Sequence, residues 1–178
     1  MQRIIFSIAT LLLSAAVFAF APPAIWQITD KYSITFSGGG EVGGLFKTFK
    51  GNIVFDEQNP AASAFGLTID VASVNTGNGL MNTHLKSAEW LDAGKYPVIH
   101  FTSKKIVKAG ADYQVTGDLE MHGVKKEVTF PFSFRNAGAT GTFSGKIFIT
   151  RSDFHIGKPG GEVDEKINIE IKVPVVKK

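Results

Sequence analysis

Apolar and polar residues alternate with a period of two along most of this chain of 178 residues. In residues 65–71, which read FGLTIDV, every second residue is apolar. The same alternation recurs in residues 113–121, 124–134 and 167–173. Because successive side chains of a strand point to opposite faces of its sheet, each segment is predicted to form a strand with one apolar and one solvated face. Strands of this kind are typical of antiparallel sheets.

Eight such segments follow one another along the chain, and turn-forming dipeptides such as Ala109-Gly110 and His122-Gly123 separate most of them. Eight amphipathic strands predict an all-β fold, a closed up-and-down antiparallel barrel, because closure removes exposed sheet edges. A two-sheet sandwich is the alternative. The predicted strands are residues 25–38, 44–56, 63–73, 97–109, 111–121, 124–135, 141–151 and 163–175.

The period-two alternation that is typical of strands is interrupted at residues 77–92. Here Leu80, His84, Leu85 and Ala88 recur at helical spacing. The pattern predicts one short helix between the third and fourth strands, placed across one end of the barrel.

The first 21 residues have the layout of a secretory signal peptide: Arg3, then an apolar run, then small residues. We expect cleavage after Ala19, or as late as Ala21, and a single domain over residues 20–178. No second apolar segment follows, so stable membrane insertion after cleavage is not expected. A periplasmic or secreted location is predicted. The chain has no cysteine, so its stability depends on the core rather than on disulfides.

Several sequence features could indicate other functions, but each gives only weak support for them. The net charge is +3, and lysine pairs such as Lys104-Lys105 are scattered, which argues against a nucleic-acid surface. Residues 38–43 (GGGEVG) match a dinucleotide-binding pattern, but a strand rather than a helix follows them, which favours a hairpin. The four histidines lack the short spacing of metal ligands, so no metal site is expected.

Residues 84–101, HLKSAEWLDAGKYPVIHF, concentrate polar groups that could form a catalytic cluster. In that interpretation His84 is a general base, Ser87 a nucleophile, and Glu89 or Asp92 an orienting carboxylate. The segment carries no nucleophile-elbow motif and no oxyanion-hole signature. We therefore predict a structural role for this segment, with Trp90 anchoring it on the barrel, and no enzymatic activity.

Four stretches, in order along the chain, resemble the YceI-like family: FKTFKGNIVFD (46–56), HLKSAEWLDAGKYPVIHFTS (84–103), VTGDLEMHGVKK (115–126) and RSDF (151–154). The resemblance extends from about Trp26 to Val175. It implies a lipocalin-like barrel in an exported bacterial protein that binds polyisoprenoid lipids. One motif departs from the family. Where members often have Asp-x-x-His-Ser, residues 30–33 read DKYS, so Tyr32 replaces the histidine.

Two interpretations of the apolar strand faces stay open: a core filled by its own side chains, or a lumen that holds a ligand. The content of 15 phenylalanines favours a wide lumen, and the family resemblance adds the ligand. The residues expected to face the lumen and contact an apolar lipid are Phe36, Phe49, Phe55, Phe65, Leu67, Ile69, Phe101, Val115, Gly117, Leu119, Phe130, Phe132, Phe143 and Ile169.

The predicted function is binding or carriage of a long-chain apolar lipid, a polyisoprenoid, with no cofactor other than that lipid. Strands of about ten residues give a barrel height of roughly 25 Å, enough to hold a long chain lengthwise. The alternatives are a stress-linked or interaction domain with a filled core, and a lipid-modifying enzyme.

Overall fold

The computed structural model describes residues 23–39, 42–158, 160 and 163–178, so the predicted signal peptide lies outside the described residues. The described chain forms strands, one α-helix and short 3-10 turns. None of its helices has the length and apolar composition needed to cross a membrane. The elements are β1 (Ala24–Ile28), β2 (Ser33–Ser37), β3 (Gly43–Phe46), β4 (Phe49–Phe55), η1 (Pro60–Ala62), β5 (Ala64–Asp70), η2 (Val71–Ser73), β6 (Val74–Asn75), α1 (Gly79–Lys86), β7 (Val98–Ala109), β8 (Asp112–Met121), β9 (Val124–Ala137), β10 (Thr140–Thr150), η3 (Arg151–Phe154) and β11 (Lys166–Lys177).

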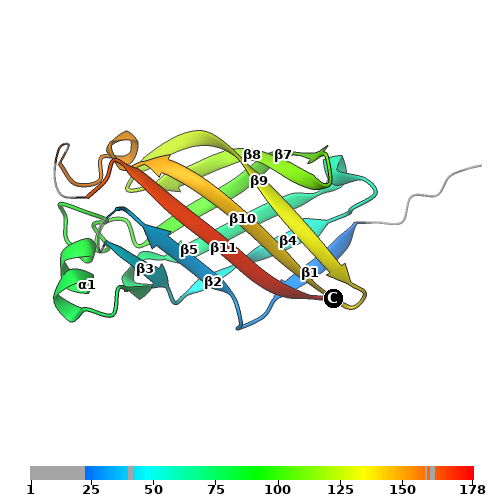
Figure 1. Ribbon diagram of the computed structural model, residues 1–178, viewed down its shortest axis with the longest axis horizontal. Helices are drawn as coiled ribbons and strands as arrows, with labels where there is room; N and C mark the ends of the chain where they lie inside the picture. Colours follow the sequence, from blue (N-terminus) through cyan, green and yellow to red (C-terminus); the bar gives the residue numbers. More distant parts are fainter. Residues whose placement is uncertain (1–22, 40–41, 159, 161–162) are drawn as a thin grey trace, which may run out of the picture.

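The strands close into an antiparallel barrel, because β1, at one end of the sheet, also pairs with β11 (Figure 1). Along β11, β1 pairs with residues 175–177 and β2 with residues 168–172, so β1 and β2 act as one interrupted strand. The pairs β3/β4 and β5/β6 are interrupted in the same way. The eleven segments therefore fill eight strand positions, which confirms the eight-stranded barrel; the sandwich alternative is wrong.

The interruption between β3 and β4 is bridged by Tyr32. Its hydroxyl donates a hydrogen bond to the Lys47 carbonyl at 2.8 Å and accepts one from the Phe49 amide at 3.0 Å. The ring packs edge-on against Phe49, with centroids 5.4 Å apart. Tyr32 thus partners backbone groups on both sides of the break.

Replacing Tyr32 by phenylalanine is expected to lower the free energy of unfolding by about 1–2 kcal/mol, because both backbone groups lose a partner. Urea denaturation of the two proteins measures this difference. Tyr32→His tests whether another side chain that can both donate and accept a hydrogen bond restores part of the loss. A Tyr32→Phe protein as stable as the parent would show that solvent replaces the hydroxyl without cost.

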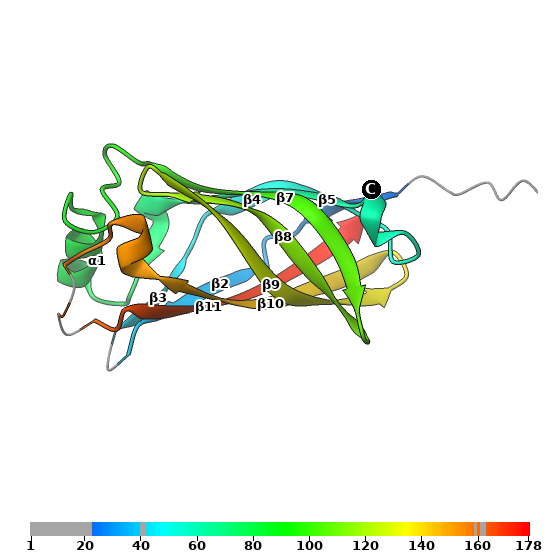
Figure 2. The same cartoon turned by 90° about the horizontal axis from the view of Figure 1, so that it is seen from above.

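One end of the barrel is covered by α1, which lies between β6 and β7 as predicted (Figure 2). The helix begins after Asn78, whose side-chain oxygen accepts hydrogen bonds from the amides of Leu80 and Met81. Leu85 of α1 is buried in the core, and Met81 of the same helix packs against the core while partly buried. η3 lies at the same end (Figure 2).

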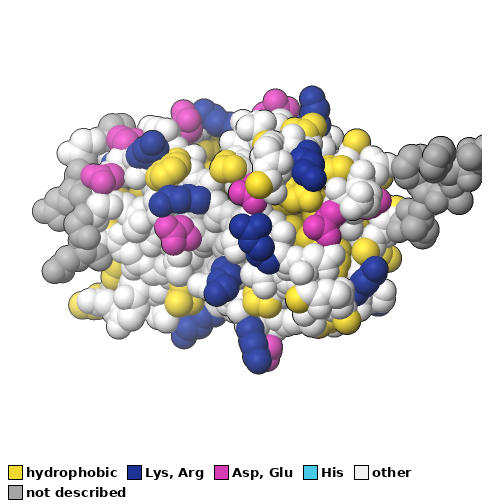
Figure 3. Space-filling view, turned by 45° about the vertical axis from the view of Figure 1, so that its right-hand side comes forward, with side chains coloured by type: hydrophobic (Ala, Val, Ile, Leu, Met, Phe, Trp, Pro, Cys, Tyr) yellow, Lys and Arg dark blue, Asp and Glu magenta, His cyan; other side chains and the backbone are white. Residues whose placement is uncertain are grey.

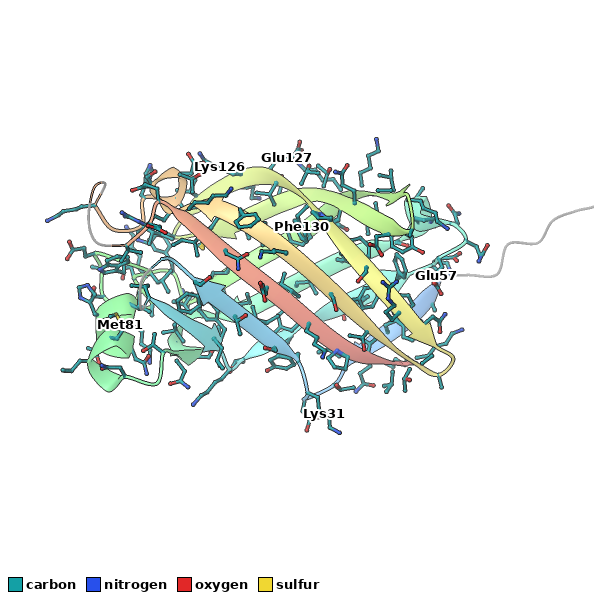
Figure 4. All side chains as sticks on the ribbon, in the orientation of Figure 1. Lys31, Glu57, Met81, Lys126, Glu127 and Phe130 are labelled. Carbon is teal, nitrogen blue, oxygen red and sulfur yellow. The ribbon has the colours of Figure 1, made fainter. Side chains whose placement is uncertain are left out.

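The barrel wall is incomplete between β9 and β10. β9 pairs with β8 along residues 124–132, but with β10 only along residues 132–137. Pro131 stands where the ladder stops, and it lacks the amide that a further rung would require. The Phe130 side chain projects from β9 toward β10 (Figure 4). On the same strand Lys126 forms an ion pair with Asp153 of η3 at 2.8 Å, while β8 pairs with this part of β9 on its other side.

Candidate functional site

The half of the barrel interior far from α1 is filled by aromatic rings. Phe55, which is 2% exposed, lies among five of them at centroid distances of 5.0–6.1 Å. Burial, with a smaller effect of the nearby Glu57 carboxylate, raises the pKa of the Tyr113 phenol, which favours its neutral form. We call this cluster the aromatic plug. Its members are Trp26, Phe55, Phe65, Tyr113, Phe132, Phe134 and Phe143, each at most 8% exposed.

The half nearer α1 is hollow and contains an apolar cavity of about 150 Å³. On each long strand, the residues that line the cavity give way to residues outside it at a similar height along the barrel. On β5, Leu67 and Ile69 line the cavity, whereas Phe65 belongs to the plug. On β9, Phe130 lines it and Phe132 does not. The interior is therefore divided into a packed half and a hollow half, which differs from the expected lumen running the full height of the barrel.

This division separates the residues that the sequence placed in the lumen. Those that line the cavity are Phe36, Phe49, Leu67, Ile69, Phe101, Leu119, Phe130 and Ile169. Those that face the interior outside the cavity are Phe55, Phe65, Val115, Gly117, Phe132 and Phe143. Contact of the first group with a lipid stays a prediction.

Gly117 shows why an inward-facing glycine does not guarantee open space. A Cβ atom built on Gly117 would lie 2.7 Å from the Phe101 ring, and it would also collide with the Thr102 carbonyl oxygen. The Phe101 ring therefore already occupies the space above Gly117. A larger residue at this position would overpack the interior rather than fill ligand space.

The end of the cavity near α1 is closed by residues that the sequence analysis did not place in the lumen. Leu85, Trp90 and Leu91 contribute from α1 and the segment after it, and Ile156 contributes from the loop after η3. The Gly157 amide donates a hydrogen bond to the Glu89 carbonyl at 2.9 Å, which joins these two segments. The helix across this end of the barrel was predicted from the sequence, but the contribution of Leu85, Trp90 and Leu91 to the cavity lining was not.

Arg151 is the one charged residue lining the cavity among the described residues, and each of its three guanidinium nitrogens donates a hydrogen bond. It donates hydrogen bonds to the carbonyls of Ile156, Val163 and Asp164 at 3.0–3.2 Å. It also lies 2.9 Å from a Glu165 carboxylate oxygen and 5.8 Å from the Trp90 ring. Arg151 thus ties together the loop that covers the cavity, and the cavity surface remains apolar.

The polar segment at residues 84–101 builds this cover. The His84 ring packs against Trp90, with centroids 5.4 Å apart, and the Ser87 carbonyl accepts hydrogen bonds from the amides of Trp90 and Asp92. His100 lies on the exposed side of β7, with Nδ1 3.2 Å from the Thr68 hydroxyl. No hydrogen bond joins the His84 and Ser87 side chains in the part of the chain that the structure describes.

The remaining sequence features are also accounted for by the fold. β2 and β3 pair antiparallel, and close to their connection the Gly38 amide donates a hydrogen bond to the Val42 carbonyl at 2.9 Å; residues 40–41 of the glycine-rich motif lie outside the described residues. Within the described ranges, His, Asp and Glu side chains form no group that could hold a metal ion. On the face shown in Figure 3, positive and negative side chains are interspersed rather than gathered into one basic patch.

Comparisons with known proteins agree with this architecture. Residues 26–175 match the family model for the YceI-like domain. The chain is 39% identical over 139 residues to Protein YceI of Escherichia coli O17:K52:H18, covering 71% of this chain and 72% of that protein. Burkholderia cenocepacia BcnA superposes with a TM-score of 0.80 at 30% identity, covering 83% of this chain and 99% of the other.

A polyisoprenoid binding domain from Saccharophagus degradans, implicated in plant cell wall breakdown, has the same fold. Its TM-score is 0.66 at 16% identity, and the match covers 88% of this chain and 99% of that domain. The family match spans nearly the whole described barrel, and the identity to the Escherichia coli protein extends over most of both chains. This chain is therefore a member of the YceI-like family.

Proposed function

We propose that this protein binds an apolar isoprenoid lipid in the hollow half of the barrel and carries it. The observation that supports the proposal is the cavity itself, whose described lining is apolar apart from an arginine that is already bonded to backbone carbonyls. Such a surface favours a ligand chain without polar groups, at about 0.8 kcal/mol for each methylene removed from water. Family membership and the lipid-binding neighbour point to the same ligand class.

The proposal includes export and excludes catalysis. Residues 1–19 would direct the chain out of the cytoplasm and be removed, so the carrier would act in the periplasm or outside the cell. N-terminal sequencing of the mature protein checks this, with Phe20 as the expected first residue. The backbone hydrogen bonds of residues 84–93 support a binding role, because they fix the segment that covers the cavity.

Two measurements test lipid binding. Protein purified without denaturants is extracted with organic solvent, and the extract is examined for isoprenoids by mass spectrometry. Purified protein is then titrated with geranylgeraniol, a 20-carbon isoprenoid alcohol. A clean extract together with no binding would favour the filled-core alternative and overturn the proposal. Turnover of the added alcohol would instead indicate an enzyme.

A matched pair of variants locates the site. Ile149 lines the cavity, whereas Ile25 is 52% exposed on the outer surface. Ile149→Trp should fill ligand space and weaken binding at least tenfold, and Ile25→Trp should leave binding unchanged. Thermal melts confirm that both proteins fold. Equal binding by the two variants would contradict a site in the hollow half.

A further inference from the structure

An exposed leucine lies on α1, at one end of the long axis of the molecule (Figure 1). The Leu80 side chain is 85% exposed, more than any other large apolar side chain in the described ranges. A single exposed leucine is common, but its surroundings here are not. Residues 71–85 contain no Asp, Glu, Lys or Arg, although these residue types make up 20% of the whole chain. We call residues 75–83 the uncharged tip.

The polar side chains of the uncharged tip bond to groups within the tip. The Asn82 side-chain oxygen accepts hydrogen bonds from the Thr76 amide and hydroxyl at 2.7 and 2.9 Å, and its amide group donates to the Asn75 side chain at 3.3 Å. The Thr83 hydroxyl donates to the Gly79 carbonyl at 3.0 Å. Polar groups that already have partners cost less to remove from water than free ones. The tip can therefore enter a less polar medium with its fold intact.

Lysines flank the uncharged tip on both sides. Lys47 lies at its base, joined to η2 by a backbone hydrogen bond, and Lys86 ends α1. The carboxylates that bound the stretch in the sequence are engaged, because Asp70 caps η2 and Glu89 lies 3.6 Å from the Lys158 ammonium. An exposed apolar side chain with cations on either side suits the interface of a bilayer, where the apolar group leaves water and the cations approach anionic head groups.

We propose that the uncharged tip docks this protein reversibly on a membrane with anionic head groups, with Leu80 in the interface and Lys47 and Lys86 beside the lipid phosphates. The docking is peripheral and requires no membrane-spanning helix. A bilayer fits better than a second protein, because lipid chains part around one protruding side chain, whereas a rigid partner needs a matching pocket. The inference goes beyond the proposed function, since docking does not depend on what the barrel binds.

Vesicle co-sedimentation tests the docking and the part of Leu80 in it. The purified mature protein should bind vesicles of phosphatidylglycerol and phosphatidylethanolamine, and Leu80→Ser should weaken its partition by about fivefold or more. Ile25 is the matched control, because it is 52% exposed and lies on β1 at the opposite end of the barrel (Figure 1). Ile25→Ser should leave the partition unchanged, and thermal melts confirm that both variants fold.

A second pair of variants tests the lysines. Lys47→Gln combined with Lys86→Gln should weaken binding to the anionic vesicles by about fivefold or more, and should change binding to phosphatidylcholine vesicles by less than about twofold. Lys108 and Lys177 are exposed at the other end of the barrel, so the double glutamine variant at those positions should behave like the parent. Added salt should weaken binding of the parent to the anionic vesicles.

A tryptophan reporter locates the contact on the protein surface. Trp26 is buried and Trp90 partly buried, so a tryptophan introduced at an exposed position is distinguishable by its response to vesicles. The emission of Leu80→Trp should shift to shorter wavelength on anionic vesicles and be quenched by brominated lipid chains. The emission of Ile25→Trp should show neither response.

Each remaining outcome would overturn the proposal. Equal partition of the parent and Leu80→Ser would mean that another surface docks. No binding of the parent to anionic vesicles would refute docking, while isoprenoid in the solvent extract would still support the proposed function. Self-association of the parent that Leu80→Ser abolishes, without vesicle binding, would assign the uncharged tip to contact between copies of the chain.

Discussion

Replacing Arg151 by alanine is expected to lower the free energy of unfolding by about 3–5 kcal/mol, because three hydrogen bonds from its buried, charged guanidinium to backbone carbonyls are lost. The guanidinium side chain is 2% exposed. Its loss leaves the carbonyls of Ile156, Val163 and Asp164 without their guanidinium donors, and the Glu165 carboxylate without its ion-pair partner. Buried acceptors without partners are costly, so the loop that covers the cavity should lose its order.

Arg135 provides the matched control. Its side chain is 75% exposed and lies 3.7 Å from Asp112, so Arg135→Ala should change stability by less than about 0.5 kcal/mol. Arg151→Lys keeps the charge but not the planar fork of donors, and we expect it to recover only a small part of the loss. Urea denaturation of the lipid-free proteins measures all three. An Arg151→Ala protein within about 1 kcal/mol of the parent would show that water satisfies the freed carbonyls.

Phe55→Ala is expected to have an effect of similar size, about 3–5 kcal/mol, because it leaves a cavity at the centre of the aromatic plug. Phe55 packs against five other rings and is 2% exposed, so the surrounding side chains cannot all move in to fill the space. Calorimetry would record the loss as a lower melting temperature and a lower enthalpy of unfolding.

The control for Phe55 is Phe148, which is 51% exposed on the outer surface of β10. Phe148→Ala should change stability by less than about 1 kcal/mol, since its ring contacts mainly the ammonium groups of Lys146 and Lys166. Losses of equal size for Phe55→Ala and Phe148→Ala would mean that the packed half does not dominate the stability of the barrel.

The period-two pattern was sufficient to predict the barrel, but not the interruptions within its strands. Residues 44–56 were predicted as one strand, whereas the structure divides them at residues 47–48 into β3 and β4. The groups that satisfy the break come from distant positions, namely the Tyr32 hydroxyl and the Ser73 hydroxyl, which accepts from the Thr48 amide. Local alternation carries no information about such partners.

The alternation of apolar and polar residues could not predict that the barrel interior is divided into a packed half and a hollow half. Phe65 and Leu67 occupy equivalent inward positions on β5, yet one belongs to the plug and the other lines the cavity. The difference depends on rings contributed by β4, β9 and β10, which meet only after the barrel closes. Arg151 was missed for a related reason, because a charged residue after a strand is normally expected at the surface.

The separation of a packed half from a hollow half has a consequence for how such a barrel diverges during evolution. Proteins tolerate substitutions only while their stability stays above a threshold. Here the aromatic plug is a cluster of buried rings outside the cavity, whereas aliphatic residues such as Ile147, Ile149 and Ile169 shape the cavity. Exchanges among Val, Ile, Leu and Met at those positions alter the cavity at little cost to the fold. Descendants of one barrel can therefore acquire different ligands while inheriting the same source of stability.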